Sequence, residues 1–312
     1  MIDRRPNPAQ PAGAADREPP FATRVSALPV LGLGVSTEYG ARQASGGLDP
    51  FALAAAEPRF GAFLEVGVEV VKGLDEDAKR WASAGRPTTY HFLDVNLDEA
   101  QDLDPAWLDA VRGHLATLKP AWMCGDAGLW HFGPRDRGHM LLLPPILDDD
   151  AATEMAHGIV ALRAALGVEV LPENPPGQVF IGSLHLLDFF ARVAEQADTG
   201  LLLDLAHLAI YQQSQGLSWD AALDALPLER VVEIHLAGGV ERQHEGLTWI
   251  EDAHGKDILP DAWRLFEAIA PRAPNLKAVV FECERNPMAD ALPGFERIAA
   301  VVPALAAAGA RR

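Results

Sequence analysis

The chain has 312 residues, and 49% of them are hydrophobic, which is enough to fill the core of one α/β barrel of roughly 250 residues or more. Its 26 basic and 44 acidic side chains give a formal charge of −18 at pH 7, so we expect no nucleic-acid partner. Two cysteines are too few for a disulfide framework, and no apolar run approaches the ~18 residues of a membrane helix; we therefore expect a cytoplasmic protein without a membrane partner.

The N-terminal segment differs in composition from the rest of the chain. The stretch MIDRRPNPAQPAGAADREPP is rich in proline and alanine and has early arginines but no apolar run. This composition argues against a secretory signal and favours disorder. We therefore expect residues 1–25 to form a disordered leader and residues 26–312 to form a single domain.

After this leader, short apolar runs alternate with longer amphipathic segments. The runs that we interpret as strands are Leu28–Ser36, Ala62–Gly67, Thr88–Phe92, Ala121–Asp126, Val168–Asn174, Gly200–Ala206, Val231–Ala237 and Lys277–Glu284. Helical spacing of apolar residues is clearest in Asp104–Leu118, Asp149–Gly167, Ser183–Asp198 and Leu292–Gly309. About eight strands, each followed by a helical segment, predict an α/β fold whose parallel sheet closes into a (β/α)8 TIM barrel. An open doubly wound sheet is the alternative, but no G-x-G-x-x-G follows the first strand.

Acidic and imidazole side chains recur where the predicted strands end, which is where TIM barrels place their active sites. These side chains are Glu65, Glu69, His91, Asp126, Glu173, Asp204, His207, His235, Asp252, His254, Glu282 and Glu284, with Asp252 and His254 in the loop after the seventh strand; the amide of Asn174 follows Glu173. Buried carboxylates so close together would repel one another, and multivalent cations remove that cost. Mixed imidazole and carboxylate ligands suit iron, manganese or zinc, and they outnumber the four or so ligands of one zinc ion. We therefore expect two or more metal ions.

Simpler roles stay open for individual residues. A single histidine at a strand end is more often a structural group than a ligand, and Glu65 and Glu69 could act as ion-pair partners. Cys124 and Cys283 are expected to be buried small hydrophobic residues. The metal-site prediction therefore depends on the joint pattern and not on any one residue.

Several stretches resemble, in the same order, the motifs of the DUF692 family, the multinuclear non-haem iron-dependent oxidases. They are FLEVGVE, YHF, LLLPPILDDDAATEMA, LPENPPG, TGLLLDLAHLAIY, DALPLERVVEIHLAGG, DAHG and VVFECERNP. Together they cover most of the chain from Pro29 to Ala306, and the pair EIHLAG and DAHG is the most specific part.

The resemblance implies a xylose-isomerase-like TIM barrel with two or three iron ions. It also implies an oxidase that uses O2 on cysteine-containing, ribosomally synthesised precursor peptides, often with a partner protein that presents the peptide. Iron would be held by His91, Glu173, Asp204, His235, Asp252, His254 and Glu282, with Asn174 in support. We expect Glu65, Glu69, Asp126 and His131 to surround the metals or the substrate.

The chain departs from the family pattern after the fourth strand. The family has S-D-H there, whereas this chain has GDA, so Ala127 takes the place of a ligand histidine. His131 lies a few residues further on, and we hypothesise that His207 restores the lost nitrogen ligand. Two other functions stay open: a divalent-metal isomerase or hydrolase on the same barrel, and a non-catalytic peptide-binding subunit that has lost a complete metal centre.

Overall fold

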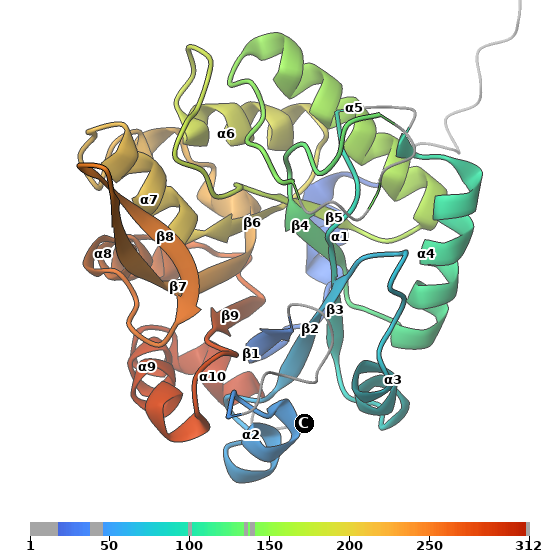
Figure 1. The fold of residues 1–312 in the computed structure, drawn as a ribbon. Coiled ribbons are helices and arrows are strands. Elements are labelled where there is room, and N and C mark those ends of the chain that lie inside the picture. Colours follow the sequence, from blue (N-terminus) through green and yellow to red (C-terminus); the bar gives the residue numbers. More distant parts are fainter. Residues whose placement is uncertain (1–17, 38–45, 99–101, 134–136, 138–140, 310–312) are drawn as a thin grey trace, which may run out of the picture.

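Eight parallel strands form a closed barrel at the centre of the molecule (Figure 1). The computed structural model describes residues 18–37, 46–98, 102–133, 137 and 141–309. Its strands are β1 (Gly32–Thr37), β2 (Phe63–Val68), β3 (Thr88–Phe92), β4 (Met123–Asp126), β5 (Val170–Glu173), β6 (Leu201–Asp204), β7 (Val231–His244), β8 (Leu247–Gly255) and β9 (Ala278–Glu282). β1 to β7 follow one another around the barrel, and β9 pairs with both β7 and β1 to close it. The predicted TIM barrel is confirmed.

Helices follow most strands and pack around the barrel (Figure 1). They are α1 (Phe21–Ala27), α2 (Pro50–Ala56), α3 (Glu76–Ser83), α4 (Pro105–Leu118), α5 (Asp149–Leu166), α6 (Leu186–Gln196), α7 (Leu205–Ser214), α8 (Pro260–Ile269), α9 (Met288–Val301) and α10 (Pro303–Gly309). α4 begins as its sequence predicts, because the Asp104 carboxylate accepts the Trp107 N–H and Pro105 occupies the first turn. α5 ends at Gly167, whose φ of 70° suits glycine.

Helix α1 corrects the expected end of the leader. We expected disorder up to residue 25, but the helix starts at Phe21, and Phe21 and Val25 are buried. Both pack with Leu31, Trp122 and Val232 in an apolar cluster. A helix of 7 residues is too short for its periodicity to stand out from a polar leader. Residues 1–17 lie outside the described residues.

Strands β7 and β8 form an arm that extends beyond the barrel (Figure 1). β7 leaves the barrel after Gly238 and pairs antiparallel with β8 through a turn at Glu245 and Gly246, whose φ values are 48° and 84°. Two residues with positive φ are typical of a tight hairpin. We expected Asp252 and His254 in a loop; the structure places them in β8. The arm is largely exposed, so its sequence lacks the apolar alternation that marks a strand.

No single helix among the described residues is both long and apolar enough to cross a bilayer. Helices α9 and α10 reach that length and composition only as a pair, and they are bent by 116° relative to each other.

Candidate metal centre

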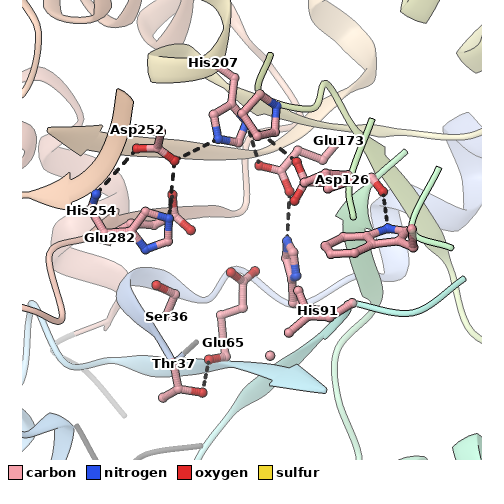
Figure 2. A pocket seen from close by; sticks show the side chains of 15 residues that line it. Ser36, Thr37, Glu65, His91, Asp126, Glu173, His207, Asp252, His254 and Glu282 are labelled. Carbon is pink, nitrogen blue, oxygen red and sulfur yellow. Dashed lines mark hydrogen bonds and ion pairs between the residues drawn. The ribbon is translucent and has the colours of Figure 1, made fainter. Parts of the chain in front are cut away.

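A cavity of about 210 Å³ opens at the carboxyl ends of the barrel strands (Figure 2). It is lined by Ser36, Thr37, Glu65, Gly67, His91, Leu93, Asp126, Trp130, Leu142, Glu173, Pro176, His207, Asp252, His254 and Glu282. None of these described residues is a lysine or an arginine. The carboxylates of the cavity therefore face imidazoles and one another, without a permanent positive charge in its lining.

Glu173, the last residue of β5, lies at the centre of the polar cluster. Its Oε2 is 2.8 Å from His91 Nε2, and its Oε1 is 3.4 Å from His235 Nδ1 and 3.7 Å from His207 Nδ1. Figure 2 shows the His91 and His207 side chains approaching Glu173 from different elements. One buried carboxylate thus contacts imidazoles from β3, β7 and α7, an arrangement suited to a ligand shared between two metal ions.

A second part of the cluster joins the arm to the barrel. On the arm, Asp252 Oδ2 lies 3.1 Å from His207 Nε2 and 3.4 Å from His254 Nε2. At the end of β9, Glu282 Oε1 lies 3.4 Å from His235 Nδ1, and Oε2 lies 3.8 Å from His254 Nε2. The arm therefore brings two ligand candidates against residues of the closed barrel.

Three overlapping sets of these side chains have the spacing of metal ligands. In each set, one donor atom from every member lies within 4.8 Å of the others: His91, Asp126 and Glu173; Glu173, Asp204 and His235; Glu65, His235 and Glu282. Atoms that bind one ion at about 2.0–2.2 Å must lie this close together. Because Glu173 and His235 each belong to two sets, the geometry favours neighbouring ions with shared ligands.

Several buried atoms of the cluster have no hydrogen-bond partner among the described residues. They are Asp126 Oδ1, Asp204 Oδ2, His235 Nδ1 and Glu282 Oε2. Buried polar atoms are almost always satisfied, so four exceptions in one cluster need an explanation. Metal ions would satisfy all four, and the nitrogen and oxygen donors suit iron, manganese or zinc. The residues present therefore fit a metal centre.

Without metal ions, some imidazole and carboxyl groups of this cluster must bind protons, because so many buried negative charges would repel one another. Burial lowers the pKa of His91, but the negative charges of Glu65 and Glu173 outweigh it and raise this pKa to about 9. Burial, reinforced by the charge of Glu173, raises the pKa of Asp126 to about 8. Burial opposes the ionisation of Glu173, but the charge of His235 holds the Glu173 pKa below its usual value. Metal ions would displace these protons.

We expect the metal-free protein to lose stability as pH rises from about 6.5 to about 9. The folded pKa of His91 lies above its ordinary value of 6.5, so its stabilising contribution is complete below 6.5 and is lost as pH rises through about 9. The contribution of Asp126, whose pKa burial raises from 3.8 to about 8, falls as pH rises from about 3.8 to about 8, so it adds to the loss in the lower part of this range. The prediction is checked by measuring the melting temperatures of metal-free and metal-loaded protein across this pH range. The melting temperature of the metal-free protein alone should fall; if it stayed constant or rose, the prediction would be wrong.

Asn174 and Asp204 are positioned by each other. The Asn174 amide donates to the Asp204 carbonyl at 2.8 Å and accepts the Asp204 N–H at 2.9 Å. These bonds tie the end of β5 to the end of β6. The Asp204 carboxylate also caps α7 by accepting the His207 N–H at 2.6 Å. The expected supporting role of Asn174 thus has a specific geometry.

His207 lies beside the strand end where the sequence has Ala127. Ala127 is fully buried and offers no donor. His207 Nδ1 lies 3.7 Å from Asp126 Oδ1 and 3.0 Å from the Asn174 carbonyl oxygen, which accepts a hydrogen bond from this nitrogen. His207 Nε2 then faces the Asp252 carboxylate. An imidazole from α7 therefore occupies the neighbourhood of the missing β4 histidine.

Two residues expected near the metals lie elsewhere. His131 is fully buried, with its Nε2 2.9 Å from Asp102 Oδ2 and its Nδ1 2.7 Å from the Gly133 carbonyl oxygen, and it does not line the cavity. Glu69 is buried outside the cavity lining, with its carboxylate 2.5 Å from Lys72 Nζ. Both residues follow the end of their strand, so the alternation that directs strand side chains no longer applies to them.

Comparison with known proteins identifies the family of this chain. Residues 50–302 match the model of a family described as RiPP precursor modification enzyme MbnB/TglH/ChrH. The chain belongs to this family. Among its relatives is a UPF0276 protein of Rhizorhabdus wittichii, 26% identical over 256 residues, covering 77% of this chain and 90% of that one. A UPF0276 protein of Neisseria meningitidis serogroup B is 26% identical over 248 residues, covering 78% and 82%. The resemblance to DUF692 is confirmed.

Solved structures similar to this MbnB/TglH/ChrH family member share its fold. A xylose isomerase-like TIM barrel protein from Mycobacterium smegmatis, in complex with magnesium, has a TM-score of 0.53 and 12% identity over 91% of this chain and 98% of that one. D-psicose 3-epimerase in the presence of D-fructose has a TM-score of 0.52 and 12% identity over 87% and 99%. At this identity they show the fold alone, a xylose-isomerase-like barrel.

The sequence-based prediction noted Glu284 at a strand end without giving it a specific role, and it did not name Glu233. Glu284 forms a short bond with His254 Nδ1 and accepts the Ser36 hydroxyl at 3.4 Å, so it directs His254 Nε2 towards the cluster. Glu233 lies deeper in β7, and its carboxylate accepts a hydrogen bond from the Trp122 indole N–H at 2.6 Å. Burial and the nearby charge of Glu65 raise the pKa of Glu233 to about 8. Its spacing of two residues from His235 was the available signal.

The two cysteines are free and buried, as expected. Cys124 has a polar contact as well, because its thiol donates to Glu65 Oε2 at 3.2 Å. The same oxygen accepts from the Thr89 hydroxyl at 3.3 Å and lies 3.2 Å from His235 Nε2. Three donors on one oxygen fix the orientation of the Glu65 carboxylate at the cavity floor.

Proposed function

We propose that this protein is a multinuclear iron-dependent oxidase that uses O2 to modify a cysteine of a ribosomally synthesised precursor peptide in the cytoplasm. The family supports a precursor peptide as the substrate. The observation that carries the metal part of the proposal is the overlap of three buried donor sets through Glu173 and His235. By the same family resemblance, we propose that a partner protein presents the peptide.

Two or three iron ions would be held by residues from all sides of the cluster. His91, Asp126 and Glu173 would hold one ion, and Glu173, Asp204 and His235 a neighbouring one. The donors left for a further ion are His207, Asp252, His254 and Glu282. When bound, ferrous iron supplies open coordination positions and the one-electron chemistry that O2 requires.

The chain itself would position the substrate and limit water. Trp130, Leu142 and Pro176 supply the apolar part of the cavity wall, against which the carbon atoms of a cysteine side chain can pack. The Glu65 carboxylate is held in one orientation by its three donors, and Glu284 holds the His254 ring. Such fixed groups keep the metal ligands from rearranging when a peptide enters.

The test is the metal content and O2 consumption of protein purified without oxygen and loaded with ferrous salt. We expect two or three irons per chain, with Mössbauer spectra of coupled ions, and O2 consumption that depends on a cysteine-bearing peptide encoded beside the gene. Protein that binds zinc, manganese or magnesium in preference to iron and is inert to O2 would instead indicate a divalent-metal isomerase or hydrolase. Full iron loading without O2 consumption would favour a non-catalytic peptide-binding subunit, the alternative that Ala127 supports.

A further inference from the structure

A groove beside the cavity shares two of its walls with the cavity. The groove has a volume of about 520 Å³, and its walls include Gln178 and Val179 from the loop after β5 and residues 247–250 of β8. The same loop lines the cavity with Pro176, and the same strand lines it with Asp252 and His254. A chain lying in the groove along β8 would therefore be led into the candidate metal centre.

One edge of β8 is not paired with another described strand, and residues 247–250 line the groove together with Ile210, Gln213 and Ser214 of α7. Among the described strands, β8 pairs only with β7. The two-residue turn makes His244 and Leu247 a hydrogen-bonded pair, so the alternation of an antiparallel ladder turns the N–H and C=O groups of Thr248 and Ile250 away from β7. In agreement, the Ile250 carbonyl accepts the Gln178 amide at 2.6 Å on that side.

The edge lacks two of the devices that usually prevent strand addition. The sequence LTWIEDAHG of β8 contains no lysine and no proline, which commonly protect edge strands. Around the groove, Leu247 and Val179 are 71% and 73% exposed. Backbone groups that no neighbouring strand pairs, here with the Ile250 carbonyl bonded only to the Gln178 side chain, lie beside exposed apolar side chains. Extended peptides use such features when they add a strand to a sheet.

We infer that the free edge of β8 binds the precursor peptide as an added strand and guides it into the cavity. This inference rests on the proposed function only in taking a peptide as the substrate. The occupant that we propose is a flexible chain, because a cavity of about 210 Å³ is too small to admit a folded partner. Ile250 and His254 are four residues apart, about 13 Å along a strand, so the modified residue lies about four residues from the one that pairs with Ile250.

The test uses linear peptides with one fixed cysteine, displayed as a random library on phage and selected without O2 against the full-length protein. Selected peptides are synthesised, and their affinities are measured for the wild type, Thr248→Pro and Thr248→Val. Proline at this edge position removes the outward N–H, whereas valine keeps it and matches the shape of threonine. Thr248 does not line the cavity, and it lies four residues before Asp252 on β8, so the metal content of both variants should equal that of the wild type.

We expect at least a tenfold weaker affinity for Thr248→Pro, nearly unchanged affinity for Thr248→Val, and slowed amide exchange at residues 247–250 when peptide binds. A library that yields no binder, binders that tolerate Thr248→Pro, or protection confined to another surface would overturn the inference. Because binding is measured without O2 and without turnover, this outcome is independent of whether the protein is an iron oxidase.

Discussion

Glu173→Gln is expected to reduce the bound iron to below roughly half of the wild-type content and to abolish O2-dependent activity. Glu173 belongs to two of the donor sets and lies within 2.8 to 3.7 Å of three imidazole nitrogens. Glutamine has nearly the same size, but it is neutral and its amide nitrogen cannot bind a metal ion. A bridging ligand would therefore be lost without a large change in packing. Iron quantification and Mössbauer spectroscopy measure the effect.

Glu251→Gln provides the matched control for this experiment. The Glu251 side chain is 49% exposed, lies on β8 next to Asp252, and pairs with Arg242 on the surface of the arm. The same chemical change there should leave iron content and activity at the wild-type level. If Glu173→Gln kept the full complement of iron, the shared-ligand arrangement would be excluded.

His207→Ala is expected to lower the iron content by about one ion per chain, the number that a single lost nitrogen ligand would free. The prediction follows from the place of this imidazole beside Asp126 and Asp252, next to the strand end where Ala127 offers no donor. Unchanged iron stoichiometry together with unchanged activity would exclude His207 as a ligand.

Two further variants separate ligation from folding. His207→Asn keeps a polar side chain that can still hydrogen-bond to the Asn174 carbonyl, so its metal-free melting temperature should stay near that of the wild type while the ion is lost. His157→Ala removes an exposed histidine of α5 and should change neither quantity. A loss of iron in His157→Ala as well would show that the assay reports general damage.

Much of the cluster could be predicted because it lies at the ends of parallel strands. Asp126, Glu173, Asp204 and Glu282 are each the last residue of a strand, and His91 is the last but one. Closing the sheet brings such positions to one mouth whatever their distance in sequence. The family motifs carry the same residues, so pattern and resemblance led to one region.

The residues whose positions could not be predicted have contacts that do not follow from a place at the end of a barrel strand. Glu233 is an acid within an apolar strand, and its bond to the Trp122 indole and its place beside Glu65 are contacts that appear only in the folded barrel. His131 and Glu69 follow the ends of their strands, where the local turn decides their direction. The arm has one paired edge and much exposed surface, so its composition resembles that of a loop.

Metal binding would affect the position of the arm as well as the chemistry of the cavity. Asp252 and His254 belong to a two-stranded hairpin that extends beyond the barrel, whereas their partners His207 and Glu282 belong to the rim of the barrel. An ion held by both groups would fix the hairpin to the rim. Protein without iron would then have a more mobile β8, the strand along which we place the peptide. It would therefore bind the peptide weakly as well as lack activity.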